Sequence, residues 1–309
     1  MEKKSEEQMW LEDRCTASED GAMKENYGPE FRNLSRDELD VVIGWAEAEG
    51  WNPGHHDAVA FWAADQEGYY GMFQDGELIG SASIVSYGGE MGFVGLFIVK
   101  PEWRGKGLGT QFWHFFIGRL RERLRPDAPA ALDGVFAMQE YYAKSGFVFL
   151  HRNLRMLGTG ERSGADAELV DLIALPFEEL VEYDRAHFGA ARAEFLHSWI
   201  TAEGGLALGL KRGGKLVGMG VVRPCHRGFK IGPLFADDAE AADRIFRGLS
   251  SHAAGQPLFL SIPENNAEAV ALAKRHGLIE CFGCARMVMG PVPDLPWSKI
   301  YGVTSFELG

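Results

Sequence analysis

The chain has 309 residues, 46% of them hydrophobic, and a formal net charge of -13 at pH 7. This length and composition predict a globular protein of two ordinary domains, each with its own hydrophobic core. Nucleic acid is not expected as a partner, because phosphate backbones are bound by clustered Lys and Arg. A membrane is not expected either, since no stretch reaches the roughly 18 apolar residues of a spanning helix.

The start of the chain and its cysteines indicate a cytoplasmic protein. Residues 1–29 are rich in acidic side chains and predict a flexible, solvated arm without the apolar run of a signal peptide. Four cysteines are too few for a disulfide framework and fit a reducing compartment. Cys281 and Cys284 have the spacing of metal ligands, but no second pair follows, so we expect two thiols on a strand and no metal.

The order of predicted elements is that of a mixed α/β fold. Ser35 and Glu38 form a capping box, Asp75-Gly76 is a hairpin turn signal, and the run from Phe93 is continuously apolar. In chain order the patterns predict helices over 35–48 and 57–65, a hairpin over 69–87, a central strand over 93–99, a helix over 107–123 and a strand from 132 to 135.

The two halves of the chain repeat one pattern. DGELIGSASIV, from Asp75, parallels GGKLVGMGVV, from Gly213, at an offset of 138 residues, and Gly146 parallels Gly277 at an offset of 131. The second copy has therefore lost seven residues, which fall where the first copy carries a glycine-rich loop. We predict one domain over 30–158 and a second over 167–309, joined by a linker that starts near Leu157.

The glycine-rich loop reads RGKGLG, from Arg104 to Gly109, and lies between the apolar strand and a helix. Its spacing fits neither a P-loop nor a dinucleotide fingerprint. Backbone N–H groups at a helix N-terminus nevertheless bind a pyrophosphate well, and Arg104 and Lys106 are available for further phosphate oxygens.

The segment from Val99 to Gly109, V-x-P-x-x-R-G-K-G-L-G, resembles the acetyl-CoA loop of the GNAT acetyltransferases. YAKSGF, from Tyr142 to Phe147, resembles that family's second signature, Tyr-x-x-x-Gly-Phe. The resemblance implies two tandem GNAT folds, with the pantetheine arm paired along the apolar strand and the pyrophosphate held by the loop. The implied acetyl-CoA contacts are Phe97, Ile98, Val99, Arg104, Gly105, Lys106, Gly107, Leu108, Gly109, Thr110, Gln139 and Tyr142.

The sequence departs from the family pattern in both copies. The family's usual Asn, seven residues before the Tyr, is Val135 in the first copy. The second copy has that Asn, Asn266, but carries Ala273 in place of the tyrosine and no glycine-rich loop. We therefore expect the second domain neither to bind acetyl-CoA nor to catalyse, and instead to wall off the acceptor site.

Acetyl transfer to an amine needs a neutral nucleophile and a proton for the departing CoA thiolate. The resemblance implies Tyr142 as the general acid. No base stands out. Asp133 is expected on the strand beside the predicted cofactor cleft, and Glu90, His55 and His56 come from loops that could border this cleft.

Three regions are candidates for the acceptor site. Trp51 and Asn52, held between glycine and proline, offer an apolar face and a polar handle, with His56 close in sequence. Asp184 and Arg192 could bind the amine and a carboxylate of the acceptor, or brace the domain as a salt bridge. The alternating tail 299–308 predicts a strand that pairs with the sheet and borders the shared cleft.

The resulting hypothesis is a tandem GNAT N-acetyltransferase that moves the acetyl group of acetyl-CoA to the amine of a small molecule. Transfer would be direct, within a ternary complex, because no cysteine is expected beside the cofactor strand. The alternatives are an acyl-CoA-binding regulatory or sensor protein without turnover, and a protein N-acetyltransferase.

Overall fold

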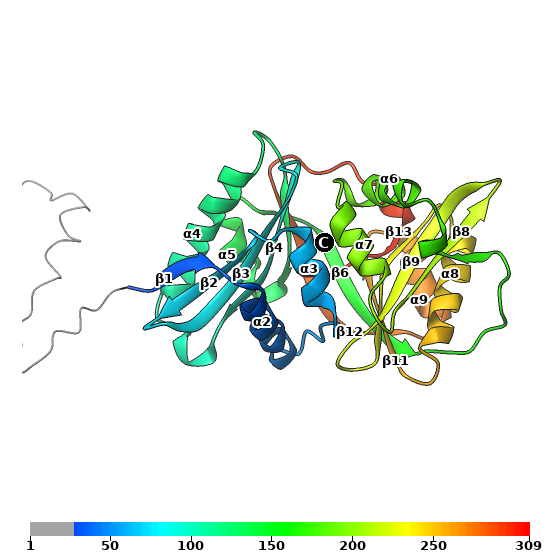
Figure 1. The fold of residues 1–309 in the computed structure, drawn as a ribbon, viewed down its shortest axis with the longest axis horizontal. Coiled ribbons are helices and arrows are strands. Elements are labelled where there is room, and N and C mark those ends of the chain that lie inside the picture. Colours follow the sequence, from blue (N-terminus) through cyan, green and yellow to red (C-terminus); the bar gives the residue numbers. More distant parts are fainter. Residues whose placement is uncertain (1–27) are drawn as a thin grey trace, which may run out of the picture.

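A computed structural model describes residues 28–309, so nearly all of the predicted N-terminal arm, 1–29, lies outside the described residues. Two halves lie side by side along one continuous sheet (Figure 1). The first half contains β1 (Glu30–Asn33), α2 (Arg36–Ala48), α3 (Asp57–Ala64), β2 (Tyr69–Gln74), β3 (Glu77–Tyr87), β4 (Met91–Val99), α4 (Leu108–Arg123), β5 (Ala130–Val135), α5 (Gln139–Ala143) and β6 (Val148–Thr159).

The second half repeats this order and ends in the middle of the molecule (Figure 1). It contains β7 (Leu169–Asp171), α6 (Phe177–Phe188), α7 (Ala193–Ile200), β8 (Leu206–Arg212), β9 (Lys215–Pro224), β10 (Phe229–Ala236), α8 (Ala239–His252), β11 (Pro257–Pro263), α9 (Ala267–Arg275), β12 (Ile279–Met289) and β13 (Ile300–Gly302).

The two copies exchange their last strands. The sheet order is β1-β2-β3-β4-β5-β12-β6-β11-β10-β9-β8-β7, so β12 completes the first half and β6 completes the second. Where β6 meets β12, Asn153 lies opposite Cys284, its own counterpart at the offset of 131 residues. A pseudo-twofold axis therefore passes between these two residues, which confirms the duplication. The ranges 30–158 and 167–309 describe the repeats, but each repeat gives one strand to the other half.

The local signals in the sequence give the expected elements. The capping box of Ser35 and Glu38 begins α2, and Asp75 and Gly76 turn the β2–β3 hairpin with φ of 53° and 81°. The predicted linker was placed too early, because residues 157–159 still belong to β6 and pair with β11. The mixed sheet, with parallel β4–β5 and β10–β11 pairs among antiparallel ones, is confirmed.

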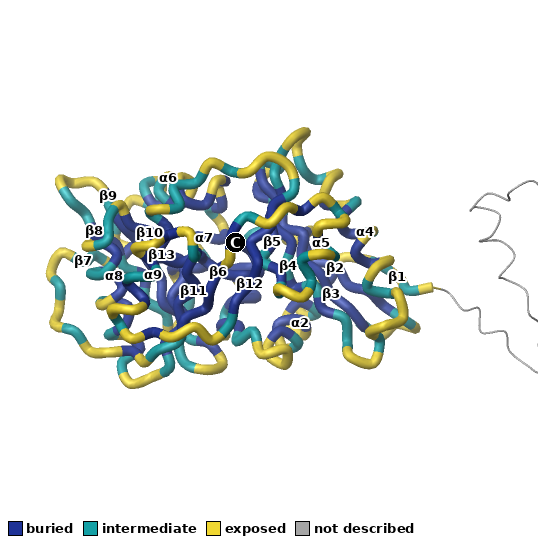
Figure 2. The backbone as a smooth tube through the Cα atoms, turned by 180° about the vertical axis from the view of Figure 1, so that it is seen from behind, coloured by how far each residue is buried: buried dark blue, intermediate teal, exposed yellow. Residues whose placement is uncertain are grey.

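Buried strands form the centre of the molecule, while exposed residues follow the outer helix faces and loops (Figure 2). One hydrophobic core crosses from one half to the other and includes the aromatic rings of Phe61 on α3 and Trp199 on α7, which stack 6.2 Å apart. Buried in the same region, Asp57 of α3 forms an ion pair with Arg223 of β9 at 2.7 Å. The two halves are thus joined by strand pairing, by aromatic packing and by a buried charge pair.

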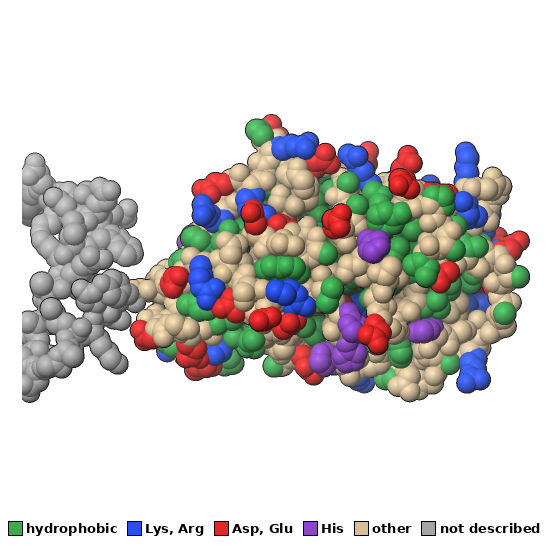
Figure 3. Space-filling view, viewed as in Figure 1, with side chains coloured by type: hydrophobic (Ala, Val, Ile, Leu, Met, Phe, Trp, Pro, Cys, Tyr) green, Lys and Arg blue, Asp and Glu red, His purple; other side chains and the backbone are tan. Residues whose placement is uncertain are grey.

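The surface carries acidic and basic side chains interspersed over the face seen in Figure 3. Within residues 28–309 no helix is long and apolar enough to cross a membrane. The same residues contain no group of three or more His, Cys, Asp or Glu side chains placed to hold a metal ion.

Candidate active site

A cavity of about 660 Å³ opens where β4 and β5 diverge. The two parallel strands are paired only over Gly92–Val94 and Ala130–Leu132, and the left-handed φ of 47° at Leu96 marks the bulge beyond that pairing. From Gly95 to Val99, β4 still pairs with β3 on its other side. One edge of this stretch therefore faces the cavity and is free to pair with an extended ligand.

The glycine-rich loop closes one end of the cavity. Gly105 and Gly107 have φ of 76° and 77°, which glycine adopts at little cost, and Gly107 is the N-cap of α4 without a side-chain cap. Within the described residues, the backbone N–H groups of residues 105–109 donate to no other group. This is the arrangement that binds phosphate oxygens at a helix N-terminus, so the residues present fit a CoA pyrophosphate.

Most of the predicted cofactor residues meet at this cavity. Its walls include Phe97, Ile98, Val99, Arg104, Gly105, Gly107, Gly109, Thr110 and Tyr142. Three others do not line it: Lys106 stacks its ammonium over the ring of Trp103 at 4.6 Å, while Leu108 and Gln139 face elsewhere. Arg104 donates from Nε to the carbonyl of Val99 at 2.7 Å and also pairs with Glu49.

Tyr142 lies on α5 with its ring against Trp113, at a centroid distance of 5.1 Å. Gly134 on β5 makes room for it, because a Cβ there would lie 2.2 Å from the tyrosine ring. Burial, followed by the neighbouring Cys284 and Tyr141, raises the pKa of Tyr142 above its ordinary value. The phenol therefore keeps its proton at neutral pH, as a hydrogen-bond donor to a leaving thiolate must.

Asp133 lines the cavity but is not available as a base. Its side chain is fully buried, and both carboxylate oxygens accept hydrogen bonds from Arg286, at 2.8 and 2.7 Å, with a further bond from Asn153 at 2.8 Å. A carboxylate held in this way positions Arg286. These hydrogen bonds occupy the oxygens that a base would use, which speaks against the sequence-based assignment of Asp133 as a base.

The residues that follow α2 have different roles in the structure. Trp51 lines the cavity, as predicted, and its carbonyl accepts from Arg155. Asn52 instead binds the second half: its Nδ2 donates to the carbonyl of Arg227 at 3.2 Å, and its Oδ1 accepts from the backbone N–H of the same residue at 2.8 Å. His56 is the N-cap position of α3, makes no side-chain cap and does not line the cavity. Of these three residues, only Trp51 lines the cavity.

The other loop candidates are also structural. His55 packs against His226 of the second half, at a ring distance of 4.9 Å. Glu90 pairs with Arg125 and Arg185 on the surface. Neither His55 nor Glu90 lines the cavity.

Asp184 and Arg192 do not line the cavity. They form a bidentate ion pair, with both distances at 2.8 Å, and both side chains are almost completely buried away from the cavity. Arg192 also donates to Thr304 Oγ1 at 2.8 Å. The alternative in the sequence interpretation, a brace, is the correct one, and what it braces is the C-terminal tail.

The second half supplies a further wall of the cavity, of which the sequence analysis predicted the tail but not the exchanged strand. Phe282 and Cys284 come from the exchanged strand β12, and Phe306 and Glu307 come from the tail after β13. The predicted bordering of the cleft by the tail is confirmed, although only residues 300–302 form a strand. Cys284 contradicts the expectation of no cysteine here, but burial raises the pKa of its thiol, so it is not an activated nucleophile.

The corresponding slot of the second copy is filled by the chain itself. β13 pairs with β10 through Leu234 and Phe235, the counterparts of Leu96 and Phe97 at the offset of 138. Asn266 donates from Nδ2 to the carbonyl of Ile300 at 2.9 Å. Where the first copy has its glycine-rich loop, Asp238 caps α8 by accepting from Ala241. Protein backbone thus occupies the place that an extended ligand would take.

This fold and this slot define the class of protein. Residues 25–147 match the acetyltransferase (GNAT) family, and residues 180–302 match an acetyltransferase (GNAT) domain. The chain belongs to the GNAT family and carries two GNAT domains. The protein is therefore an enzyme that transfers acyl groups.

Individual relatives agree with this assignment. Holothin acyltransferase of Pseudoalteromonas sp. (strain SANK 73390) is 28% identical over 289 residues, which is 93% of this chain and 97% of that protein. A putative acetyltransferase from Pyrococcus horikoshii has a similar structure, with a TM-score of 0.78 at 22% identity over 95% of this chain and 99% of that one. A tandem GNAT protein from the clavulanic acid biosynthesis pathway has a TM-score of 0.58 at 14% identity, over 85% and 99% of the two chains.

Proposed function

We propose that the protein is an N-acyltransferase that moves the acetyl group of acetyl-CoA to the amine of a small molecule. The single observation that carries the proposal is the cavity, which joins the glycine-rich loop of the first copy to aromatic and charged residues of the second half. A donor site and an acceptor site in one enclosed space suit a small acceptor better than a protein chain. The relative named holothin acyltransferase, with one compound in its name, supports the same choice.

In this proposal the donor lies along β4. The free edge of residues 95–99 would pair with the pantetheine arm, and the N–H groups of residues 105–109 with Arg104 would hold the pyrophosphate. The acyl end would then lie at the bulge of Leu96. The second slot would take no donor, because β13 already fills it.

We propose direct transfer, without an acyl-enzyme. Cys284 is the cysteine that lines the cavity among residues 28–309, and its raised pKa keeps it a thiol. Tyr142 would donate a hydrogen bond to the sulfur as charge develops there. A CoA-type thiol has a pKa of about 8.5, which is below the pKa of this buried phenol. Tyr142 would therefore stabilise the thiolate by donating a hydrogen bond while the phenol keeps its own proton. The free thiols of Cys225, Cys281 and Cys284 suit a cytoplasmic setting.

The test is turnover with a panel of amines, measured as release of the free CoA thiol from acetyl-CoA and longer acyl-CoA donors. Wild-type protein should turn over, and Tyr142→Phe should lower kcat by about 100-fold or more while leaving the affinity for acetyl-CoA unchanged. Tyr141→Phe, its neighbour, is the matched control. Binding of acetyl-CoA without turnover by any amine would contradict this proposal and favour a sensor.

A further inference from the structure

Two charged side chains of the cavity wall each have one buried polar atom without a hydrogen-bond partner. Glu307 Oε2 and Arg155 Nε are buried, and neither has a hydrogen-bond partner within residues 28–309. The remaining charged groups of the cavity wall are paired, Arg104 with Glu49 and Asp133 with Arg286. A buried polar atom without a hydrogen-bond partner is costly. Two such atoms in the wall of one cavity therefore indicate a ligand that forms hydrogen bonds with both.

Arg155 lacks a carboxylate because of the duplication. Its counterpart Arg286 lies opposite Asp133 and pairs with it, whereas Arg155 lies opposite Ser261 of β11. Arg155 is nevertheless held firmly: Nη1 donates to the carbonyl of Trp51 at 2.8 Å, and the guanidinium lies over the ring of Phe306 at 4.7 Å. The Nε–H therefore remains as a fixed, unused donor beside aromatic walls.

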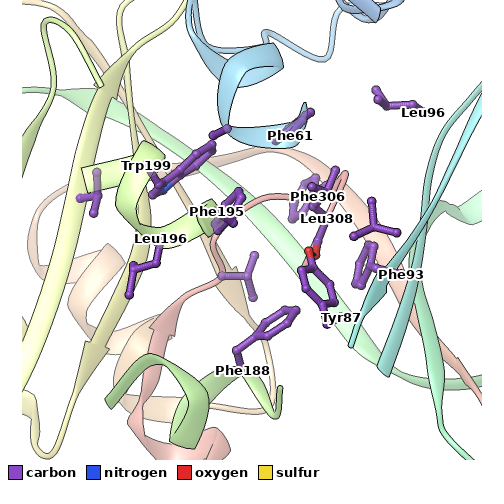
Figure 4. Packing of buried hydrophobic residues seen from close by; sticks show 14 of the residues in the cluster. Phe61, Tyr87, Phe93, Leu96, Phe188, Phe195, Leu196, Trp199, Phe306 and Leu308 are labelled. Carbon is purple, nitrogen blue, oxygen red and sulfur yellow. The ribbon is translucent and has the colours of Figure 1, made fainter. Parts of the chain in front are cut away.

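Hydrogen bonds on either side of Glu307 fix the C-terminal tail that carries it. Tyr87 Oη donates to the carbonyl of Leu308 at 2.8 Å, and the backbone N–H of Leu308 donates to Ser305 Oγ at 3.0 Å. Figure 4 shows Phe306 and Leu308 enclosed between side chains of the two halves. A side chain at Gly95 would not fit, since a Cβ there would lie 2.1 Å from the carbonyl oxygen of Glu307.

The close approach of the Glu307 backbone to Gly95 places Glu307 at the end of the slot that lies away from the glycine-rich loop. The glycine-rich loop lies at the far end of β4, and Gly95 adjoins the bulge at Leu96 where the proposed donor would end. Three titratable side chains from other elements, Arg223 of β9, Lys230 of β10 and Cys284 of β12, interact electrostatically with Glu307.

We infer that Glu307 is the catalytic base for the acceptor amine and that Arg155 binds an oxygen of the same acceptor. The inference rests on the proposed function and names its substrate class: an alkyl amine attached to a planar or aromatic ring that carries a carbonyl or carboxylate oxygen. Trp51, Phe282 and Phe306 supply the flat apolar walls for the ring. Because Arg155 Nε and Glu307 Oε2 each lack a hydrogen-bond partner within the described residues, we place the acceptor between them.

The proton balance of the step is simple. The Glu307 carboxylate takes one proton from the ammonium of the acceptor and releases it to solvent. The neutral nitrogen forms a bond to the thioester carbonyl carbon, and the carbon–sulfur bond breaks. The second nitrogen proton passes to the sulfur with the help of Tyr142, which leaves an amide and the CoA thiol.

Three probe acceptors separate these roles: meta- or para-(aminomethyl)benzoate, which has an ammonium and a carboxylate; benzylamine, which lacks the carboxylate; and aminobenzoate, whose aromatic amine is neutral at pH 7. Glu307→Gln should lower kcat/KM about 100-fold or more with (aminomethyl)benzoate, but less than about 10-fold with aminobenzoate, which needs no base. Equal losses with both acceptors would overturn the role as a base.

Arg155→Gln should raise KM about 10-fold or more for (aminomethyl)benzoate and leave that for benzylamine unchanged. Arg155→Lys, which keeps the charge and the apolar stem, is the second variant, and Glu203→Gln on the surface is the control. Equal effects of Arg155→Gln on both acceptors would overturn the binding role. The affinity for acetyl-CoA should stay unchanged in every variant. If wild-type protein binds acetyl-CoA but transfers to no amine, the proposed function itself fails.

Discussion

Each of the two copies has a slot between equivalent strands. The slot of the first copy is an open cavity, whereas the slot of the second copy is filled by the chain itself. In the first copy, β4 and β5 diverge, glycines open the N-terminus of α4, and a cavity of about 660 Å³ remains. In the second copy, β13 lies in the gap beside β10, and Asp238 caps α8 where the glycine loop is missing. The seven residues that the second copy lacks and its additional strand β13 thus account for a filled slot in the second copy where the first copy has a cavity.

The difference shows what the second copy contributes. Its exchanged strand and its tail bring Cys284, Phe282, Phe306 and Glu307 to the cavity of the first copy. The closed slot is what fixes the tail, because β13 anchors it a few residues before Glu307. The second domain therefore forms part of the wall of this cavity.

The largest predicted effect concerns the joint between the halves. Asp57→Ala leaves Arg223 as a buried charge without its partner, so the free energy of unfolding should fall by about 3–5 kcal/mol. Chemical denaturation measures this, with Asp40→Ala in the exposed Arg36–Asp40 pair as a control that should cost less than about 1 kcal/mol. A loss below 1 kcal/mol at Asp57 would show that the halves do not depend on this pair.

A second prediction uses pH at the same joint. Burial, and then the nearby Arg155, lowers the pKa of Lys230 to about 7, while its Nζ donates to the carbonyl of Asn52 at 2.7 Å. Between pH 7 and the ordinary lysine pKa the unfolded chain binds more protons than the folded chain, so stability should rise with pH in that window. The expected gain is about 2 kcal/mol from pH 7 to 9.

Lys230→Met should remove this part of the pH dependence. Denaturation of both proteins at pH 7, 8 and 9 gives the difference directly. Parallel curves for the two proteins would mean that Lys230 is protonated in the folded state throughout and that its burial has no such consequence.

The smallest predicted effect tests the closed slot. Asn266 uses Oδ1 to cap α9, accepting from Glu268 and Ala269, and Nδ2 to hold Ile300. Asn266→Ser keeps a capping oxygen but is too short for Ile300 and should cost about 1 kcal/mol, whereas Asn266→Ala loses both and should cost about 2 kcal/mol. Thermal unfolding distinguishes them. A Ser variant as stable as wild type would show that the bond to Ile300 contributes nothing.

Much of the fold could be predicted from the sequence because its signals are local. The Ser35–Glu38 capping box, the Asp75-Gly76 turn and the glycines before α4 each act within a few residues, and each gave the expected element. The internal repeat also predicted the missing loop of the second copy. The exchange of β6 and β12 was not predictable in this way, since either strand satisfies the same local pattern in either half.

The cavity wall formed by the glycine-rich loop and β4 was predictable for the same reason, and the opposite wall was not. Asp133, Asp184 and Arg192 looked available in sequence, but long-range partners use up their charges. Glu307 lies in the tail 299–308, which was predicted to border the cleft, but nothing in the sequence singled out this residue. For Arg155 one signal was present: the repeat aligns it with Arg286, and two equivalent arginines beside one cleft could have been tested for partners.

The measurement that tests the central claim most directly is calorimetric titration of acetyl-CoA into wild-type protein, Gly109→Trp and Gly118→Trp. Gly109 lines the cavity, whereas Gly118, on the same helix, has open space around it. We predict one site per chain, lost in Gly109→Trp and kept in Gly118→Trp. Two sites per chain, or binding unchanged by Gly109→Trp, would contradict the account of one open and one closed slot.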